Sequence, residues 1–276
     1  MANQLTATES EAYRRDGFLS PIRVMDVLTA ASYRERFEAY EQAQGGWYEL
    51  SKGQKIYLLQ TWAAEMASRP QVLDAVEGVL GPDIFVWGVS LFVKDAGDGT
   101  YVTWHQDATY WGLNKLSVTT AWIALSPATL QSGCMEMLPG SHEWEPLPHK
   151  DTLAKKNLLT RGQEIEVDKS DAVALELQPG EMSLHHVMTA HASAPNLSDD
   201  RRIAVAIRYV APDVAQVNGE RDGAWLVRGE DRHGNFVHET PPKADMDEAA
   251  LAEHKRITNL RQSILYDGVA GQPARR

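Results

Sequence analysis

The chain of 276 residues is poor in cysteine, in long apolar runs and in positive charge. Its one cysteine, Cys134, excludes an intramolecular disulfide and fits a reducing compartment. The polar start of the chain has no apolar run of signal-peptide length, and no later run approaches the roughly 18 residues of a membrane helix. Lys and Arg total 27 against 38 Asp and Glu, and the net charge of −11 disfavours nucleic acids and anionic membranes. We therefore expect a cytoplasmic protein whose partner is a small molecule; nothing here indicates its oligomeric state.

The remaining composition is that of an ordinary globular protein, with 43% hydrophobic and 24% charged residues. A chain of this length fits one large domain with a substantial core. The local sequence patterns change from helical to strand-like and back to helical along the chain. We therefore predict a single domain over 1–276, with a mostly helical part at 1–83, a β core at 84–210, and a loop and helix at 211–276.

Helix signals dominate the first part and strand signals the second. Thr8 and Glu11 have the spacing of a helix cap, and helices are predicted over 6–15, 25–44, 59–79 and 246–265. Strands are predicted at 84–93, 102–107, 116–125, 134–138, 172–177, 182–188 and 202–210, with Pro-Gly turns between several of them. Many short strands without intervening helices favour an antiparallel sandwich or jelly roll, open at one end to a ligand.

A histidine and an aspartate lie two residues apart in the aromatic-rich segment 101–111. In an extended strand, His105 and Asp107 point to the same face, so their side chains can converge on one metal ion. Two histidines and one carboxylate form the facial triad typical of non-heme Fe(II) sites that activate O2. The H-x-D pair alone is a weak signal, because it also occurs on surface strands, and a further histidine must come from elsewhere.

The segment after 180 offers three histidines, at 185, 186 and 191. His185 and His186 cannot both point inward from one strand, so each is a less favoured ligand than His191. Turn residues at 195–199 predict a hairpin that would place His191 and Arg202 on adjacent strands. A guanidinium beside the metal could then bind a carboxylate through two parallel hydrogen bonds.

These motifs together resemble the phytanoyl-CoA dioxygenase (PhyH) family of oxygenases that depend on Fe(II) and 2-oxoglutarate. The matching blocks are W-H-Q-D at 104–107, T-A-W-I-A-L at 120–125, S-G-C-M-E-M-L-P-G-S-H at 132–142, L-Q-P-G-E at 177–181, H-A-S-A-P-N-L-S-D-D-R-R at 191–202, and Y-R-R-D-G-F-L at 13–19. The resemblance implies a double-stranded β-helix, a cupin-like jelly roll with flanking helices. It also implies His105, Asp107 and His191 as iron ligands, and Arg202 at the distal carboxylate of 2-oxoglutarate.

The same resemblance implies further contacts to the cosubstrate and a type of reaction. Ser193, Trp122, Ser90 and Tyr57 are the candidate contacts, the last two on a looser match. The implied reaction consumes O2 and 2-oxoglutarate and releases succinate and CO2. Related halogenating enzymes have Ala or Gly in place of the carboxylate ligand, so Asp107 favours hydroxylation, or another oxidation such as desaturation or cyclisation, over halogenation.

The substrate is the least determined part of the interpretation. Candidate contacts are Trp104, Tyr110, Trp111, Trp87 and, in the loop 226–236, Arg228. An aromatic pocket could bind an apolar ring, or an ammonium group through cation–π attraction. Two other functions stay open at this point: a cupin-type metal dioxygenase that needs no cosubstrate and relies on three histidines, and a noncatalytic jelly roll that binds a small molecule.

Overall fold

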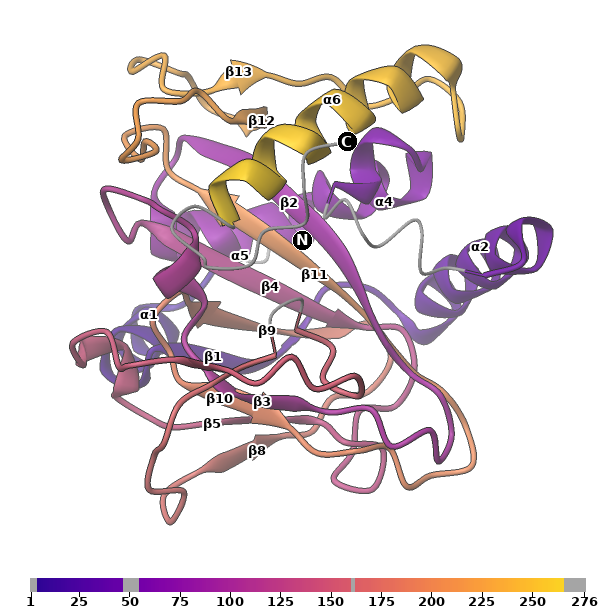
Figure 1. Ribbon diagram of the computed structural model, residues 1–276, viewed down its shortest axis with the longest axis vertical. Coiled ribbons are helices and arrows are strands. Elements are labelled where there is room, and N and C mark those ends of the chain that lie inside the picture. Colours follow the sequence, from indigo (N-terminus) through magenta and orange to yellow (C-terminus); the bar gives the residue numbers. More distant parts are fainter. Residues whose placement is uncertain (1–3, 47–54, 160–161, 266–276) are drawn as a thin grey trace.

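The computed structural model describes residues 4–46, 55–159 and 162–265, which form two stacked β-sheets flanked by helices (Figure 1). The larger sheet has the order β1-β9-β4-β11-β2-β12-β13 and the smaller one β3-β10-β5-β8. All pairs in them are antiparallel except β12 with β13. This is the predicted jelly roll. The strands of the larger sheet are Phe18–Arg23, Glu181–His186, Val118–Ala124, Arg202–Val210, Ile84–Lys94, Gly223–Arg228 and Val237–His238; those of the smaller are Val102–His105, His191–Ser193, Met135–Met137 and Val173–Leu175; β6 and β7, Lys150–Asp151 and Gln163–Glu164, pair separately.

The helices differ from the sequence prediction at two places. The first is capped by Thr6, which forms a capping box with Glu9 instead of the expected Thr8 and Glu11 pair. The single helix predicted over 59–79 is wrong, because Pro70 lacks an amide hydrogen and holds Arg69 in an extended conformation. No helix in the described ranges is long and apolar enough to cross a membrane. The helices are α1 Ala7–Asp16, α2 Val27–Gln44, α4 Thr61–Ala67, α5 Pro70–Leu80 and α6 Glu248–Leu265, with short 3₁₀ turns η1 Ile56–Leu58, η2 Asp107–Tyr110 and η3 Ser141–Glu143.

Strand β11 is the centre of the fold, because all nine of its residues are buried. Its outer face packs with the helices, and its inner face points toward the smaller sheet. The outer residues are Ile203, Val205, Ile207 and Tyr209, in one hydrophobic cluster with Phe37 of α2, Trp62 of α4 and Val72 of α5. The inner face consists of Arg202, Ala204, Ala206 and Arg208. Two buried arginines therefore point into the interior between the sheets.

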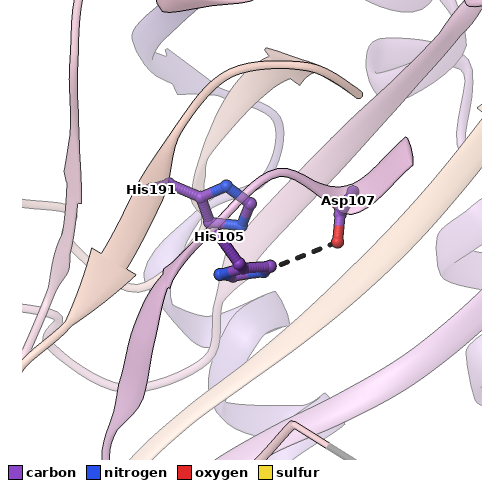
Figure 2. A group of neighbouring side chains, drawn as sticks. All are labelled: His105, Asp107 and His191. Atoms are coloured by element: carbon purple, nitrogen blue, oxygen red, sulfur yellow. Dashed lines mark ion pairs between the residues drawn. The ribbon is translucent and has the colours of Figure 1, made fainter. Parts of the chain in front are cut away.

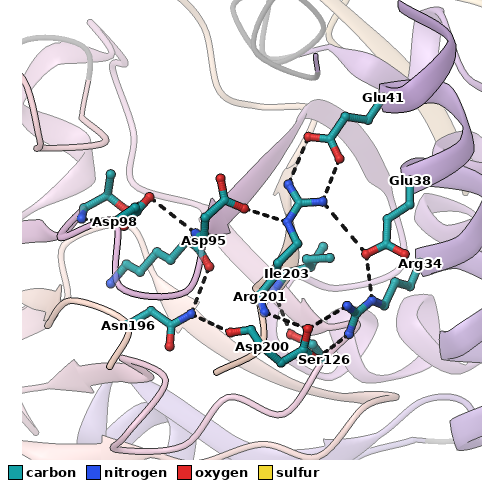
Figure 3. A network of polar contacts seen from close by, with 12 residues as sticks. Arg34, Glu38, Glu41, Asp95, Asp98, Ser126, Asn196, Asp200, Arg201 and Ile203 are labelled. Carbon is teal, nitrogen blue, oxygen red and sulfur yellow. Dashed lines mark hydrogen bonds and ion pairs between the residues drawn. The ribbon is translucent and has the colours of Figure 1, made fainter. Parts of the chain in front are cut away.

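An exposed ion-pair network fixes the start of β11 (Figure 3). Arg201 contacts Glu41 of α2 at 2.6 Å and Asp95, just after β2, at 2.6 Å. Arg34 of α2 binds both carboxylate oxygens of Asp200. Since neighbouring strand residues point to opposite faces, holding Arg201 outside turns Arg202 inward.

The predicted hairpin between His191 and Arg202 is wrong in its pairing. Strand β10 pairs with β3 and β5, whereas β11 pairs with β2 and β4. The two residues therefore lie on opposite sheets and face a shared interior. The connection between them passes close to Gly133, whose φ of +73° and contact with the carbonyl of Ala194 leave no space for a Cβ atom.

Candidate metal centre

Three potential metal ligands converge at one place between the sheets (Figure 2). His105 ends β3, Asp107 begins the turn η2, and His191 begins β10. His105 and His191 are direct partners in the β3–β10 pair, and their ring centroids are 4.1 Å apart. His105 Nε2 lies 3.6 Å from Asp107 Oδ1, and one potential ligand atom from each of the three lies within 4.8 Å of the others. The strand predicted for 102–107 ends at His105, so Asp107 reaches the others from a turn.

Both imidazole rings have the same orienting contact. His105 Nδ1 lies 2.9 Å from the carbonyl oxygen of Thr103, and His191 Nδ1 lies 2.9 Å from that of Thr189. A carbonyl can only accept, so each Nδ1 carries the proton, and the Nε2 lone pair is left for a metal. Such a contact to the second nitrogen is the usual way in which proteins orient a histidine ligand.

The charge state of these residues also suits a cation. Burial and the neighbouring His105 and His185 hold the pKa of His191 well below its usual range, so this imidazole is neutral at neutral pH. Burial alone would raise the pKa of Asp107, but the close approach of His105 and neighbouring charges, including Arg208, hold this pKa well below its usual range. Two imidazoles and one carboxylate are the donor set expected for Fe(II).

The candidate ligands line a cavity of about 470 Å³ that extends along the inner face of β11. Arg202 lines the same cavity and is 1% exposed. Its Nε and Nη2 atoms have no hydrogen-bond partner among the described residues. Burial lowers the pKa of Arg202 to about 10, so the guanidinium still carries its charge at neutral pH. A buried cation with two unused N–H groups fits a carboxylate that the protein itself does not supply.

Two other predicted cosubstrate contacts, Ser193 and Trp122, also line the cavity. The Arg202 guanidinium lies 5.1 Å from the Trp122 ring centroid, a cation–π contact. Ser193 Oγ accepts a 2.6 Å hydrogen bond from Lys94, which is fully buried and is the direct strand partner of Arg202. Burial and the nearby Arg202 charge lower the pKa of Lys94 to about 6. Lys94 is therefore neutral at neutral pH and orients Ser193, and Arg202 supplies the positive charge at this end of the cavity.

Several other predicted contacts lie outside the cavity lining. The Tyr57 hydroxyl donates to Glu239 beneath β2, and Arg228 pairs with Asp74 and Glu77 of α5. Trp104 packs in a separate cluster behind β3, because it alternates with His105. Arg228 and Trp104, predicted as substrate contacts, and Tyr57, predicted as a cosubstrate contact, therefore do not line this cavity.

The remaining predicted residues gather near the opposite end of the cavity. Ser90 accepts a 2.8 Å hydrogen bond from Arg208, and Arg208 lies 5.5 Å from the ring centroid of Trp111. Trp87 packs edge-on against Trp111 at 5.1 Å. The side chain of Tyr110 lies outside the part of the chain that the structure describes. Ser90 and the two tryptophans therefore support the cavity wall from behind.

Sequence reasoning missed two buried basic residues, Lys94 and Arg208, and it left His185 and His186 as less favoured ligand candidates. In the sequence, Lys94 and Arg208 resemble ordinary charges at a strand end or on the surface. One signal was available: Arg208 lies six residues after Arg202, and residues separated by an even number in a strand point to the same face. His185 lines the cavity, whereas His186 faces outward toward His142, as their alternation predicts. His185 is nevertheless not part of the three-residue ligand cluster found among the described residues.

Comparison with known proteins adds an independent result. The family model described as phytanoyl-CoA dioxygenase (PhyH) matches residues 13–204. A probable alpha-ketoglutarate-dependent hypophosphite dioxygenase of Stutzerimonas stutzeri is 28% identical over 60% of this chain and 55% of its own length. A 1-deoxypentalenic acid 11-beta-hydroxylase of Streptomyces arenae is 28% identical over 67% and 62%, respectively. The chain thus spans little more than half of either relative.

Solved structures give a longer match. The apo form of ThoJ, titled a non-heme monooxygenase, is 35% identical, with a TM-score of 0.83 over 93% of this chain and 96% of ThoJ. Its nickel complex is 33% identical, with a TM-score of 0.78 over 94% and 99%. The likeness therefore includes the flanking helices as well as the sheets.

Proposed function

Because the chain belongs to the phytanoyl-CoA dioxygenase family, we propose that it is an Fe(II)- and 2-oxoglutarate-dependent dioxygenase that hydroxylates a C–H bond of a small molecule. The observation that carries the proposal is the pairing, in one cavity, of a two-histidine, one-carboxylate cluster with a buried arginine whose Nε and Nη2 atoms have no hydrogen-bond partner among the described residues. Iron, 2-oxoglutarate and O2 together supply the oxidant, and succinate and CO2 are the by-products.

In this proposal each residue has a separate task. His105, Asp107 and His191 hold Fe(II) on one side, which leaves positions for the cosubstrate and O2. Arg202 binds the distal carboxylate of 2-oxoglutarate, and the Trp122 ring limits where its guanidinium can lie. Ser193 and Lys94 complete the polar end of the cavity. The apolar middle of β11 keeps water away from the reacting bond.

The two rival functions leave features of the cavity unexplained. A three-histidine dioxygenase without a cosubstrate needs neither an ionised Asp107 nor a buried Arg202. A noncatalytic jelly roll gives no reason for two imidazoles with matched Nδ1 contacts. The carboxylate at 107 also supports hydroxylation over halogenation.

The wider setting is part of the same proposal. We place the activity in the cytoplasm, supported by the single cysteine, which is buried and free. The helical part, the β core and the C-terminal part are proposed to act as one domain, since α4 packs on β2 and α6 on η1.

Formation of succinate from 2-oxoglutarate, with Fe(II) and O2 added, tests the proposed function. We expect turnover by the unaltered protein and none by His191→Ala. Arg202→Ala should raise the KM for 2-oxoglutarate by roughly a hundredfold or more, since two charge-assisted hydrogen bonds are lost. Arg201→Ala is the matched control, because this neighbour points out of the cavity. Equal turnover by His191→Ala would exclude the assigned metal site. Screening of metabolites that stimulate succinate formation then identifies the substrate.

A further inference from the structure

The inner face of β11 carries an arginine near each end of the same cavity. Arg202 and Arg208 are six residues apart in one strand, which corresponds to about 20 Å between their Cα atoms. An extended five-carbon diacid such as 2-oxoglutarate is only about 7 Å long, roughly the span of two residues. A cosubstrate held by Arg202 therefore cannot also occupy Arg208.

Arg208 is held firmly in its position at the cavity wall. It is 6% exposed, donates to Ser90 Oγ at 2.8 Å, and lies 5.5 Å from the ring centroid of Trp111. Strand β2 has a bulge next to Arg208, at Trp87. The Trp87 ring packs against the ring of Trp111. The guanidinium is thus oriented by Ser90 and Trp111 while it borders the cavity, and its charge also acts on the nearby Asp107.

Two further polar groups stand beside it on the same face of the sheet. Thr120 is the direct strand partner of both Arg208 and His185, so the three form one row across β9, β4 and β11. All three line the cavity. Thr120 Oγ1 and His185 Nδ1 are buried and have no hydrogen-bond partner among the described residues. Buried polar atoms of this kind are normally satisfied, which indicates a ligand that supplies the missing partners.

We propose that this row binds a carboxylate of the substrate, with Arg208 as the charged contact and Thr120 and His185 as hydrogen-bonding neighbours. The inference rests on the proposed function and adds the chemical class of its substrate. The substrate is a small carboxylic acid with an apolar body. Because the centroid of the His185 ring lies 4.9 Å from that of the His191 ring, the row borders the metal ligands directly, and the body extends from there along the cavity. A single guanidinium fits the single charge of a carboxylate, and the apolar lining that begins at Ala206 on the same strand face fits the body.

The test uses matched probes on the protein loaded with Fe(II) and 2-oxoglutarate without O2, so that Arg202 is already engaged. Hydrocinnamate carries the carboxylate, hydrocinnamamide is its neutral counterpart, and phenethylphosphonate carries a larger anion. Titration calorimetry should give hydrocinnamate an affinity roughly ten- to a hundredfold above that of the amide, with the phosphonate weaker than the carboxylate.

Variants of Arg208 test whether this residue causes the preference for the acid over the amide. Arg208→Gln should bind acid and amide equally, Arg208→Lys should keep part of the preference, and the exposed Arg256→Gln should keep all of it. The proposal is overturned if the protein binds acid and amide equally, if neither binds, or if Arg208→Gln keeps the preference. A phosphonate that binds more tightly than the carboxylate would overturn the assigned substrate class.

Fe(II) and 2-oxoglutarate binding are measured first on the same samples. If the unaltered protein does not bind Fe(II) or does not bind 2-oxoglutarate, the proposed function is contradicted. If it binds both but shows no preference for the acid, only the role of Arg208 is contradicted. If Arg208→Gln instead weakens Fe(II) binding and leaves the acid preference unchanged, Arg208 is a positioning residue for Asp107, and the substrate assignment falls.

Discussion

Replacing Arg202 by methionine should stabilise the protein while it abolishes cosubstrate binding. Arg202 is buried with two N–H groups that have no partner among the described residues. In the absence of 2-oxoglutarate, its charge opposes folding. Methionine has a similar length, is flexible and carries no charge, so it can fill the same space beside Trp122.

The magnitude follows from the shift of the Arg202 pKa. Burial lowers this pKa from 12.5 to about 10, and a difference of about 2.5 corresponds to roughly 3 kcal/mol against the charged form in the folded state. Because the folded pKa lies below the unfolded one, this cost is fully present at neutral pH and fades only as the pH rises through 10. Loss of the cation–π contact with Trp122 offsets about 1–2 kcal/mol. We expect a net gain of about 1–2 kcal/mol.

The assay is urea denaturation at neutral pH, with and without Fe(II) and 2-oxoglutarate, under anaerobic conditions. Saturating cosubstrate at a hundred times its Kd should add about 2.7 kcal/mol to the unaltered protein and nothing to Arg202→Met. The matched control is Arg201→Met. This variant removes partly buried ion pairs with Glu41 and Asp95, so its free energy of unfolding should fall by about 1 kcal/mol while its full response to cosubstrate is kept.

Opposite signs for two adjacent arginines make this prediction easy to refute. A loss of stability in Arg202→Met would show that its guanidinium has protein partners, and the argument for an anion site would fail. An unchanged response to 2-oxoglutarate would place the cosubstrate elsewhere.

Three further predictions concern the metal, the backbone and the pH. Asp107→Ala should abolish substrate hydroxylation, because it removes the only carboxylate of the ligand cluster; product analysis that finds full turnover would remove Asp107 from its role. Gly133→Ala should cost roughly 2–3 kcal/mol in a denaturation experiment, because it combines a left-handed backbone with a clash against Ala194, whereas Gly97→Ala, with the same backbone but open space, should cost only about 1 kcal/mol; equal losses would contradict the close approach. Burial lowers the pKa of His186 to about 4, so the unfolded chain takes up a proton that the folded chain does not, and stability should fall as the pH decreases from about 6.5 toward 4; His186→Gln should flatten this fall in pH-dependent denaturation, and an identical pH profile would disprove the contribution.

The residue pattern was sufficient for the fold class and for naming the candidate metal ligands. Runs of β-branched and aromatic residues and the Pro-Gly turns gave the strands their approximate limits. The H-x-D spacing paired His105 with Asp107, although Asp107 reaches the site from the turn η2 and not from a strand. The ordered motifs added His191 and Arg202. All four line one cavity, as expected from the family resemblance.

Strand partners could not be derived in the same way. The turn residues at 195–199 suggested a hairpin, but the chain crosses there from the smaller sheet to the larger one. A turn signal specifies a change of direction and not the sheet that the chain enters. The arrangement of His191 opposite Arg202 therefore depends on long-range pairing of β10 with β3 and of β11 with β2.

The two buried basic residues could not be identified from the sequence for a related reason. Lys94 and Arg208 lie in strands whose neighbours are apolar on both faces, and such strands give no alternation from which to identify an inner charge. Trp104 and Arg228 were predicted to contact the substrate, but Trp104 packs in a hydrophobic cluster and Arg228 forms an ion pair. Aromatic and charged residues near a motif often have such structural roles.

A crystal structure of the protein grown without O2 in the presence of Fe(II) and 2-oxoglutarate tests the central claim most directly. We predict one iron bound by His105 Nε2, His191 Nε2 and a carboxylate oxygen of Asp107, with the distal carboxylate of 2-oxoglutarate on Arg202. Iron bound through His185 in place of one of these residues, or a cosubstrate that does not contact Arg202, would contradict the account.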